Sequence, residues 1–269
     1  MAKIMNKHLT NSTDEVIKLM KIGSILLLVQ NFILVLLIAI IYFLPVFMIN
    51  LLFRTALWID IIGMFILSIA FLELGKHRTE YKESANNLGF LFLVWALISI
   101  FWRVISSTSV PLNFSDQAYI VPIMYVIWCF TSFLFSYSII MLYRFLGKFY
   151  SGNLWAIKVY SIANVIVTFV LTIGIIVGFD ATKVLVEILN DTTPVNQDNI
   201  ASTFQQIAIF GFASVLKLVF VPILGLIAFY SLIQIFNEIK SADNPFKPVS
   251  NINYTFNPKK KKKRTKNQK

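Results

Sequence analysis

Long apolar runs with few polar interruptions dominate the pattern along this chain. They fall at residues 22–44, 51–73, 87–105, 118–143, 154–179 and 205–235. Each is close to or above the roughly 20 residues with which an α-helix crosses a hydrocarbon core of about 30 Å. The pattern therefore predicts an all-α polytopic membrane protein, a bundle of about six transmembrane helices.

The boundary between the first two runs is the least marked of the five. Apolar character hardly drops from Ile22 to Phe53, and the boundary is marked by Pro45, Asn50 and Arg54. A single helix of that length would overrun the bilayer, and proline breaks a helix interior. We therefore expect a turn between Pro45 and Asn50.

The ends of the first and last runs carry further signals. The pattern Ser12-x-x-Glu15 is typical of a capping box and predicts a helix that begins near Thr13. The first run exceeds the 7 to 15 apolar residues of a signal peptide and lacks a small-x-small cleavage site, so we expect it to be retained. The last run is long enough for a tilt, a kink at Pro222 or an extension into the cytosol.

Composition and charge agree with a membrane protein and give it an orientation. Charged residues make up 14% of the chain, against roughly 25% in soluble domains, which excludes a soluble globular protein. Of the 24 Lys and Arg residues, 20 lie in segments 1–21, 74–86, 144–158 and 237–269. Because basic residues collect on the cytoplasmic side, both termini are expected in the cytoplasm of a cell-membrane protein.

These patterns divide the chain into three parts. Residues 1–21 form a cytoplasmic N-terminal segment, residues 22–236 a six-helix transmembrane domain, and residues 237–269 a flexible, disordered polybasic tail. On the outer side, the apolar positions of segment 180–204 recur at helical spacing. They suit either a short helix in the membrane interface or a connecting loop.

Three charged residues lie at membrane depth, away from the ends of the runs that carry them: Asp60, Arg103 and Lys217. Each costs about 2.5 to 3.5 kcal/mol at the centre of a span, so such residues mark functional sites or paired charges. Asp60 shares a helical face of small side chains that predicts contact with protein. Because helical side chains lean toward the N-terminus, Arg103 is its expected partner. That face comprises Ala56, Asp60, Gly63, Leu67 and Ala70.

Three interpretations of this trio remain open. The first is an ion pair that fixes helix register together with a lysine that snorkels. The second is a path for a solute or proton, where two cations near one acid favour an anionic ligand. The third is that all three charges snorkel to the surface.

Weaker polar and small-residue signals concern helix packing. Gly174 and Gly178 form a GxxxG pattern that allows another helix to approach closely, either within the chain or in a dimer, and the oligomeric state is not predicted. Gln30, Asn31 and Asn164 are explained by hydrogen bonds between helices.

The C-terminal segment is the most basic part of the chain. It contains ten basic and two acidic residues, and its cluster comprises Lys259, Lys260, Lys261, Lys262, Lys263 and Arg264. Such a cluster beside a membrane binds anionic lipid headgroups, and the same attraction acts on the phosphates of ribosomal or other RNA. The alternative is a solvated tail that only enforces topology.

Motifs for catalysis and metal binding are missing from the sequence. There is no HExxH, Walker or GxSxG pattern, and one cysteine, Cys129, with two histidines cannot build a Cys/His metal centre. We therefore predict no metal or other cofactor and lean against an enzyme.

Three segments resemble uncharacterised archaeal multi-span membrane proteins that are classed as domains of unknown function. They are IGSILLL at 22–28, IIGMFILSIAFLEL at 61–74 and NNLGFLF at 86–92. The resemblance implies a membrane location, without an activity and without functional residues.

Two functions remain open at this point. The first is a membrane-anchored binding or assembly protein whose tail contacts anionic lipid or ribosomal RNA. The second is a small carrier or channel for a small, anionic solute that uses Asp60, Arg103 and Lys217.

Overall fold

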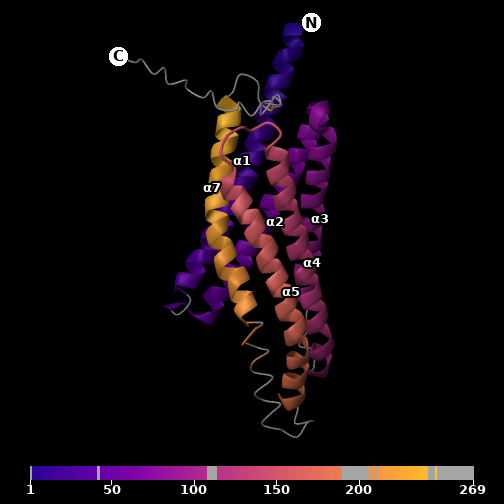
Figure 1. Cartoon of the computed structure of the whole chain (residues 1–269), viewed down its shortest axis with the longest axis vertical. Helices are drawn as coiled ribbons and strands as arrows, with labels where there is room; N and C mark the ends of the chain where they lie inside the picture. The colour runs from indigo at the N-terminus through magenta and orange to yellow at the C-terminus, as the bar shows by residue number, and fades with distance from the viewer. Residues whose placement is uncertain are drawn as a thin grey trace, which may run out of the picture.

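The computed structural model describes residues 2–40, 43–107, 114–189, 205, 208–209, 211–241 and 246. Side chains are described for 13–40, 43–45, 47–103, 126–177, 205, 208–209, 211–241 and 246. All the regular secondary structure in these residues is helical. The long helices run up and down side by side in Figure 1. The elements are α1 (Ala2–Ile40), α2 (Val46–His77), the 3₁₀-helix η2 (Thr79–Tyr81), α3 (Lys82–Ser107), α4 (Phe114–Leu146), α5 (Trp155–Leu189), the π-helix η3 (Leu216–Phe220) and α7 (Val221–Ser241).

Six of the described helical segments are long and apolar enough to span a membrane. They are Thr13–Ile40, Phe47–His77, Thr79–Arg103, Val126–Leu146, Trp155–Val177 and Gly211–Ser241. The expected all-α, six-span architecture is confirmed. A break between the first two spans is also present, but it lies earlier than the expected Pro45–Asn50 turn. The helix α2 begins directly after Pro45, so residues 46–50 are helical.

Several expected helix boundaries were wrong. The first helix begins at Ala2 and not near Thr13, because residues 2–12 contain no proline or glycine to end it. The helix α5 continues to Leu189. Residues 180–189 therefore extend the fifth span, whereas we expected a separate interfacial helix or a connecting loop there. At the C-terminal end, α7 continues to Ser241, beyond the expected start of the tail at 237.

The helices are arranged as a closed ring. In the described residues α1 packs against α2, α2 against α3, α3 against α4, α4 against α5, α5 against α7, and α7 back against α1. Each neighbour in this ring runs antiparallel to the last (Figure 1). The ring therefore encloses a common interior to which all six spans contribute.

Small side chains allow the helices of this ring to approach closely. A Cβ built on Gly23 of α1 would lie 2.7 Å from Leu67 of α2, and one on Gly225 of α7 would lie 2.5 Å from the Asn31 side chain of α1. The hydroxyl of Ser68 donates to the Gly89 carbonyl across the α2–α3 contact, at 2.7 Å. In lipid such close contacts replace the hydrophobic driving force as the source of helix association.

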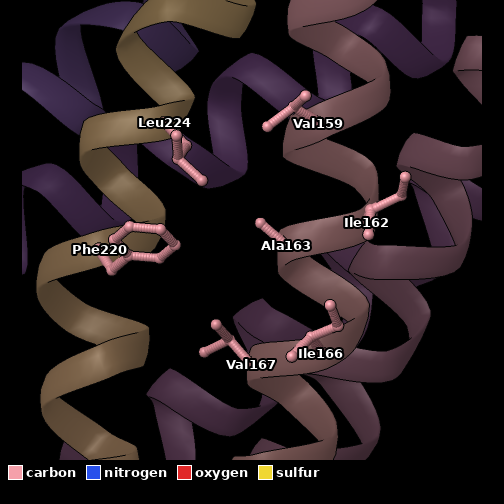
Figure 2. A pocket seen from close by; sticks show the side chains of 7 residues that line it. All are labelled: Val159, Ile162, Ala163, Ile166, Val167, Phe220 and Leu224. Carbon is pink, nitrogen blue, oxygen red and sulfur yellow. The ribbon is translucent and has the colours of Figure 1, made fainter.

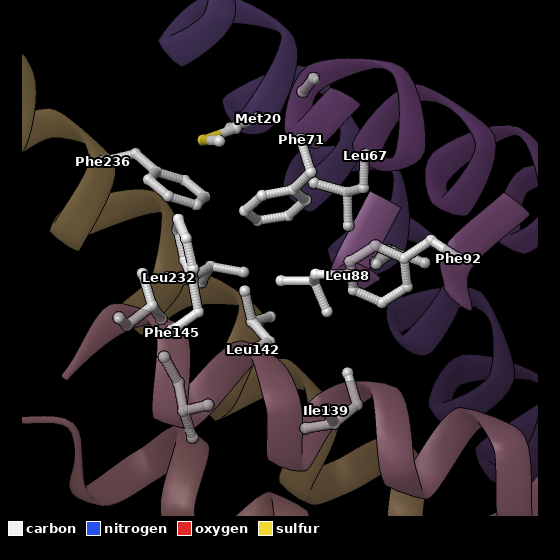
Figure 3. Packing of buried hydrophobic residues seen from close by; sticks show 14 of the residues in the cluster. Met20, Leu67, Phe71, Leu88, Phe92, Ile139, Leu142, Phe145, Leu232 and Phe236 are labelled. Carbon is white, nitrogen blue, oxygen red and sulfur yellow. The ribbon is translucent and has the colours of Figure 1, made fainter. Parts of the chain in front are cut away.

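Aromatic and aliphatic side chains pack together in the interior of the bundle toward the end of α7 (Figure 3). Phe71 packs edge-on against Phe145, with ring centroids 5.4 Å apart, and Phe145 packs against Phe149 at 5.1 Å. Phe92 and Phe236 are fully buried in the same cluster. We call this cluster the aromatic plug, because it leaves a dry, close-packed core at that end of the ring.

The outward-facing surface of the bundle is apolar. Large hydrophobic side chains stand exposed on every long helix, including Phe32, Phe65, Phe90, Phe130, Phe169 and Tyr230. A soluble protein rarely exposes apolar patches of this extent. The surface matches a hydrocarbon environment and supports an integral membrane protein.

The last span contains a π-helix just before Pro222, the residue at which the sequence suggested a kink. Pro222 has no N–H for the carbonyl of Leu218, and its ring would clash with that carbonyl in a regular α-helix. The chain forms the π-helix η3 just before it, where the N–H of Val221 donates to the Leu216 carbonyl. Such π segments are rare and often occur at functional sites.

Candidate functional site: an intramembrane polar cluster

Lys217 lies within η3 and points into the bundle. Its ammonium Nζ donates to Asn164 Oδ1 at 3.3 Å and to Thr168 Oγ1 at 3.4 Å. Asn164 and Thr168 are fully buried on α5. The lysine is therefore held by two interior polar groups from a neighbouring helix, which argues against simple snorkelling.

A chain of hydroxyls continues this contact to α4. The hydroxyls of Thr168 and Ser136 lie 3.1 Å apart, and Ser136 is buried. One turn further along α5, Thr172 lies 3.4 Å from the Sγ of Cys129. Lys217 is also within electrostatic range of Cys129, so polar groups from α4, α5 and η3 meet in one region.

Asp60 and Arg103 reach the same region from α2 and α3. Asp60 lies within electrostatic range of both Arg103 and Lys217. The guanidinium carbon of Arg103 lies 5.6 Å from the centroid of the Trp58 ring, a cation–π geometry. The structure thus brings the three predicted charges together electrostatically, while a direct ion pair between Asp60 and Arg103 stays a prediction.

We define the polar cluster as Asp60, Arg103, Asn164, Thr168 and Lys217. It lies in the half of the bundle away from the chain ends, since Lys217 precedes the end of α7 by about 36 Å at 1.5 Å per residue. The aromatic plug fills the other half. The described conformation therefore combines a polar region toward one membrane face with a closed apolar core toward the other.

An apolar groove opens beside this cluster. It has a volume of about 280 Å³, lies between α5 and the start of α7 (Figure 2), and is lined by Val159, Ile162, Ala163, Ile166, Val167, Phe220 and Leu224. Ile162 and Ile166 are about half exposed on its rim. This α5–α7 groove is open toward the surrounding lipid.

Basic residues are frequent in the helix ends and turns at the other end of the bundle, where α1 begins and α7 ends; Figure 1 shows that these helix ends lie together. The described ones are Lys18, Lys21, Lys76, Arg78, Lys82, Arg144, Lys148, Lys158 and Lys240. At the same end, the α4–α5 turn is tied to α7 by a 2.7 Å hydrogen bond from the Tyr150 hydroxyl to Glu238. Partial burial and this bond raise the pKa of Tyr150 to about 12.

One described residue beyond α7 shows how the chain leaves the bundle. Phe246 is buried and packs edge-on against Phe149, with ring centroids 4.9 Å apart. Its φ of 61° is unusual for a bulky residue. The expected lipid or RNA contacts, Lys259 to Arg264, lie outside the described residues.

The GxxxG pattern is described only in part. Gly174 of α5 is buried, next to a small cluster in which Leu171 and Ile175 pack with Ala213 and with Trp128 of α4. These contacts fit packing within the chain. The side-chain surroundings of Gly178 lie outside the described residues.

The sequence analysis assigned Asn164 to hydrogen bonding between helices, which the bond from Lys217 confirms. It did not single out Thr168 or Ser136. Hydroxyl side chains are common inside spans and usually bond to their own helix backbone, so only the rotation of each helix reveals which of them face a charge. Within the described residues, no group of three His, Cys, Asp or Glu side chains is placed to hold a metal ion.

Comparison of the chain with models of protein families, with curated proteins and with solved structures gives no match. Functional inference therefore rests on the geometry of the bundle.

Proposed function

We propose that this chain is a multi-pass protein of the cell membrane that holds both termini in the cytoplasm and binds anionic lipid headgroups through its basic end. The observation that carries the proposal is the collection of described Lys and Arg side chains at the end where α1 begins and α7 ends. Positive residues favour the cytoplasmic side of a membrane. The cluster from Lys259 to Arg264 follows in the sequence and would add to the same charged face.

The energetics favour a lipid surface as the partner. Each Lys or Arg near an anionic membrane contributes about 1 kcal/mol, and the anchoring spans already hold the tail beside such a surface. The contact of Phe246 with Phe149 keeps the start of the tail at the bundle. A tail held at the membrane meets its own headgroups at a far higher effective concentration than a free partner.

The test uses the full chain in nanodiscs of zwitterionic lipid and measures its co-flotation with vesicles. We expect binding to vesicles that contain phosphatidylglycerol, none to phosphatidylcholine, and a steep loss as salt rises, because screening shortens from about 10 Å at 0.1 M to about 3 Å at 1 M. Replacing residues 259–264 with Gln should weaken binding strongly, because it removes six positive charges from the basic end. Replacing Asn251, Asn253 and Asn257 with Gln is the control that leaves the charge unchanged. Binding to RNA without binding to the anionic vesicles would contradict the proposal.

A second candidate is a carrier for a small anionic solute, favoured by the Lys217 contacts with Asn164 and Thr168 within electrostatic range of Asp60. A polar cluster on one side of an aromatic plug has the form of a binding site that is closed toward one membrane face. Ionisable groups inside a membrane are costly and are retained where they face a pathway or a partner.

The single cysteine of the chain offers a direct test of this second candidate. Cys129 lies within electrostatic range of Lys217, so a charged, membrane-impermeant thiol reagent should modify it in intact cells if water reaches the cluster. The Cys129→Ser variant is the control. Modification only after the membrane is dissolved would reject the carrier in this conformation.

A further inference from the structure

The α5–α7 groove and the ammonium of Lys217 share one seam between two helices. The groove-lining residues Ala163 and Val167 directly precede Asn164 and Thr168, the two partners of Lys217. On the facing helix, Lys217 precedes the groove residue Phe220 by about one turn. The hydrogen-bond partners of the amine are therefore the direct sequence neighbours of two residues that line an apolar groove.

The Lys217 ammonium and the apolar groove together match the two parts of an amphiphile, a charged headgroup and a hydrocarbon chain. The lysine ammonium has three N–H donors, and its described hydrogen bonds use two of them. Lys217 and Arg103 together exceed the single negative charge of Asp60 in the cluster. A ligand that carries one negative charge would balance this excess, while its hydrocarbon part covers the groove.

The volume of the groove and the depth of Lys217 in the membrane limit which amphiphiles can bind. A volume of about 280 Å³ lies at the lower end of ligand pockets, which suits one hydrocarbon chain. Lys217 lies within the apolar span Gly211–Ser241, below the level of phospholipid headgroups. A compact carboxylate can reach that depth, whereas a bulky phosphodiester stays at the interface.

We propose that the α5–α7 groove and Lys217 form a binding site for a single-chain carboxylate of the fatty-acid class, which enters sideways from the bilayer. The chain lies along the groove between α5 and α7, over Ala163 and Leu224, and the carboxylate accepts a hydrogen bond from Lys217. This site is separate from the proposed headgroup binding at the basic end, and it requires no transport.

The test measures photolabelling of the full chain, in nanodiscs of zwitterionic lipid, by dodecanoate that carries a diazirine. Unlabelled dodecanoate should compete at least about tenfold better than dodecanol or dodecyltrimethylammonium, since only the carboxylate forms a charge-assisted hydrogen bond with the lysine ammonium. Labelled residues should map to α5 and α7. Equal competition by dodecanoate and dodecanol would overturn the proposal, and this comparison needs no variant.

Four variants distinguish the contribution of the groove from that of the Lys217 charge. Lys217→Gln should remove the preference for the carboxylate, and Lys217→Arg should keep it. Ala163→Phe should fill the groove and reduce labelling at least about tenfold. Val165→Phe places the same aromatic side chain at an exposed position of α5 outside the groove and should leave labelling unchanged. If Ala163→Phe and Val165→Phe label equally in folded protein, the groove is not the site.

Discussion

At the scale of single residues, the cost of burying charge explains how the polar cluster is built. A lysine inside a span needs partners that keep its hydrogens bonded, and Asn164 and Thr168 supply them from the neighbouring helix. Asp60 contributes the opposite charge from α2. The sequence revealed the charged members of this cluster because charges are rare in spans, but it could not reveal the hydroxyl members, which are common there.

Electrostatic coupling between Asp60 and Arg103 gives the first prediction. Asp60→Asn leaves two cations without their acid and should destabilise the bundle by roughly 3 to 5 kcal/mol. Arg103→Gln should destabilise it less, because Lys217 remains within electrostatic range of Asp60. The double variant should recover part of this loss, with a coupling energy of about 0.5 to 3 kcal/mol. Reversible unfolding in mixed micelles measures all four free energies. Strictly additive losses would show that the two charges do not interact.

Close helix contacts give a second prediction at the same scale. Gly225→Ala places a Cβ 2.5 Å from the Asn31 side chain, whereas a Cβ on Gly211 has nothing within 4 Å. Gly225→Ala should cost about 1 to 3 kcal/mol through overpacking, and Gly211→Ala should be neutral or stabilise by up to about 1 kcal/mol through helix propensity. Thermal unfolding of the two variants compares them directly. Equal effects would show that α1 and α7 do not touch at Gly225.

At the scale of elements, hydropathy predicted which segments are helices better than it predicted where they end. Apolar length reports the part of a helix that matches lipid, and it is silent about turns that continue beyond the membrane, as α1 does at Ala2 and α5 does to Leu189. Pro222 marked a disturbance in the last span correctly. That the disturbance is a π-helix was not predicted, because a proline inside a helix is compatible with a kink, a break or a widened turn.

The tether between the α4–α5 turn and α7 gives the third prediction. Burial and the bond to Glu238 raise the folded pKa of Tyr150 to about 12, above its ordinary value near 10. The stabilisation by this hydroxyl is therefore fully present below pH 10 and lost as the pH rises toward 12. Tyr150→Phe should lower stability by about 1 kcal/mol at pH 8 and flatten the pH dependence above pH 10. Thermal unfolding from pH 8 to 11.5 checks this, and an unchanged pH profile in the variant would refute the tether.

At the scale of the whole molecule, the ring of six antiparallel spans sets both ends of the described bundle on one face. The number of spans followed from the sequence because each apolar run is long enough to be recognised alone. The closure of the ring through the α1–α7 contact could not be predicted from the sequence. This contact joins the first and last spans through small residues such as Gly225. Ring closure creates the shared interior in which the aromatic plug and the polar cluster lie.

Labelling of single cysteines from outside the cell tests the central claim, a six-span protein with its basic end in the cytoplasm. In a Cys129→Ser background, cysteines at positions 113 and 190 should react with an impermeant maleimide in intact cells. Cysteines at positions 148 and 250 should react only after the cells are opened. Labelling of position 148 in intact cells would place the basic end outside and contradict the orientation on which the proposed function rests.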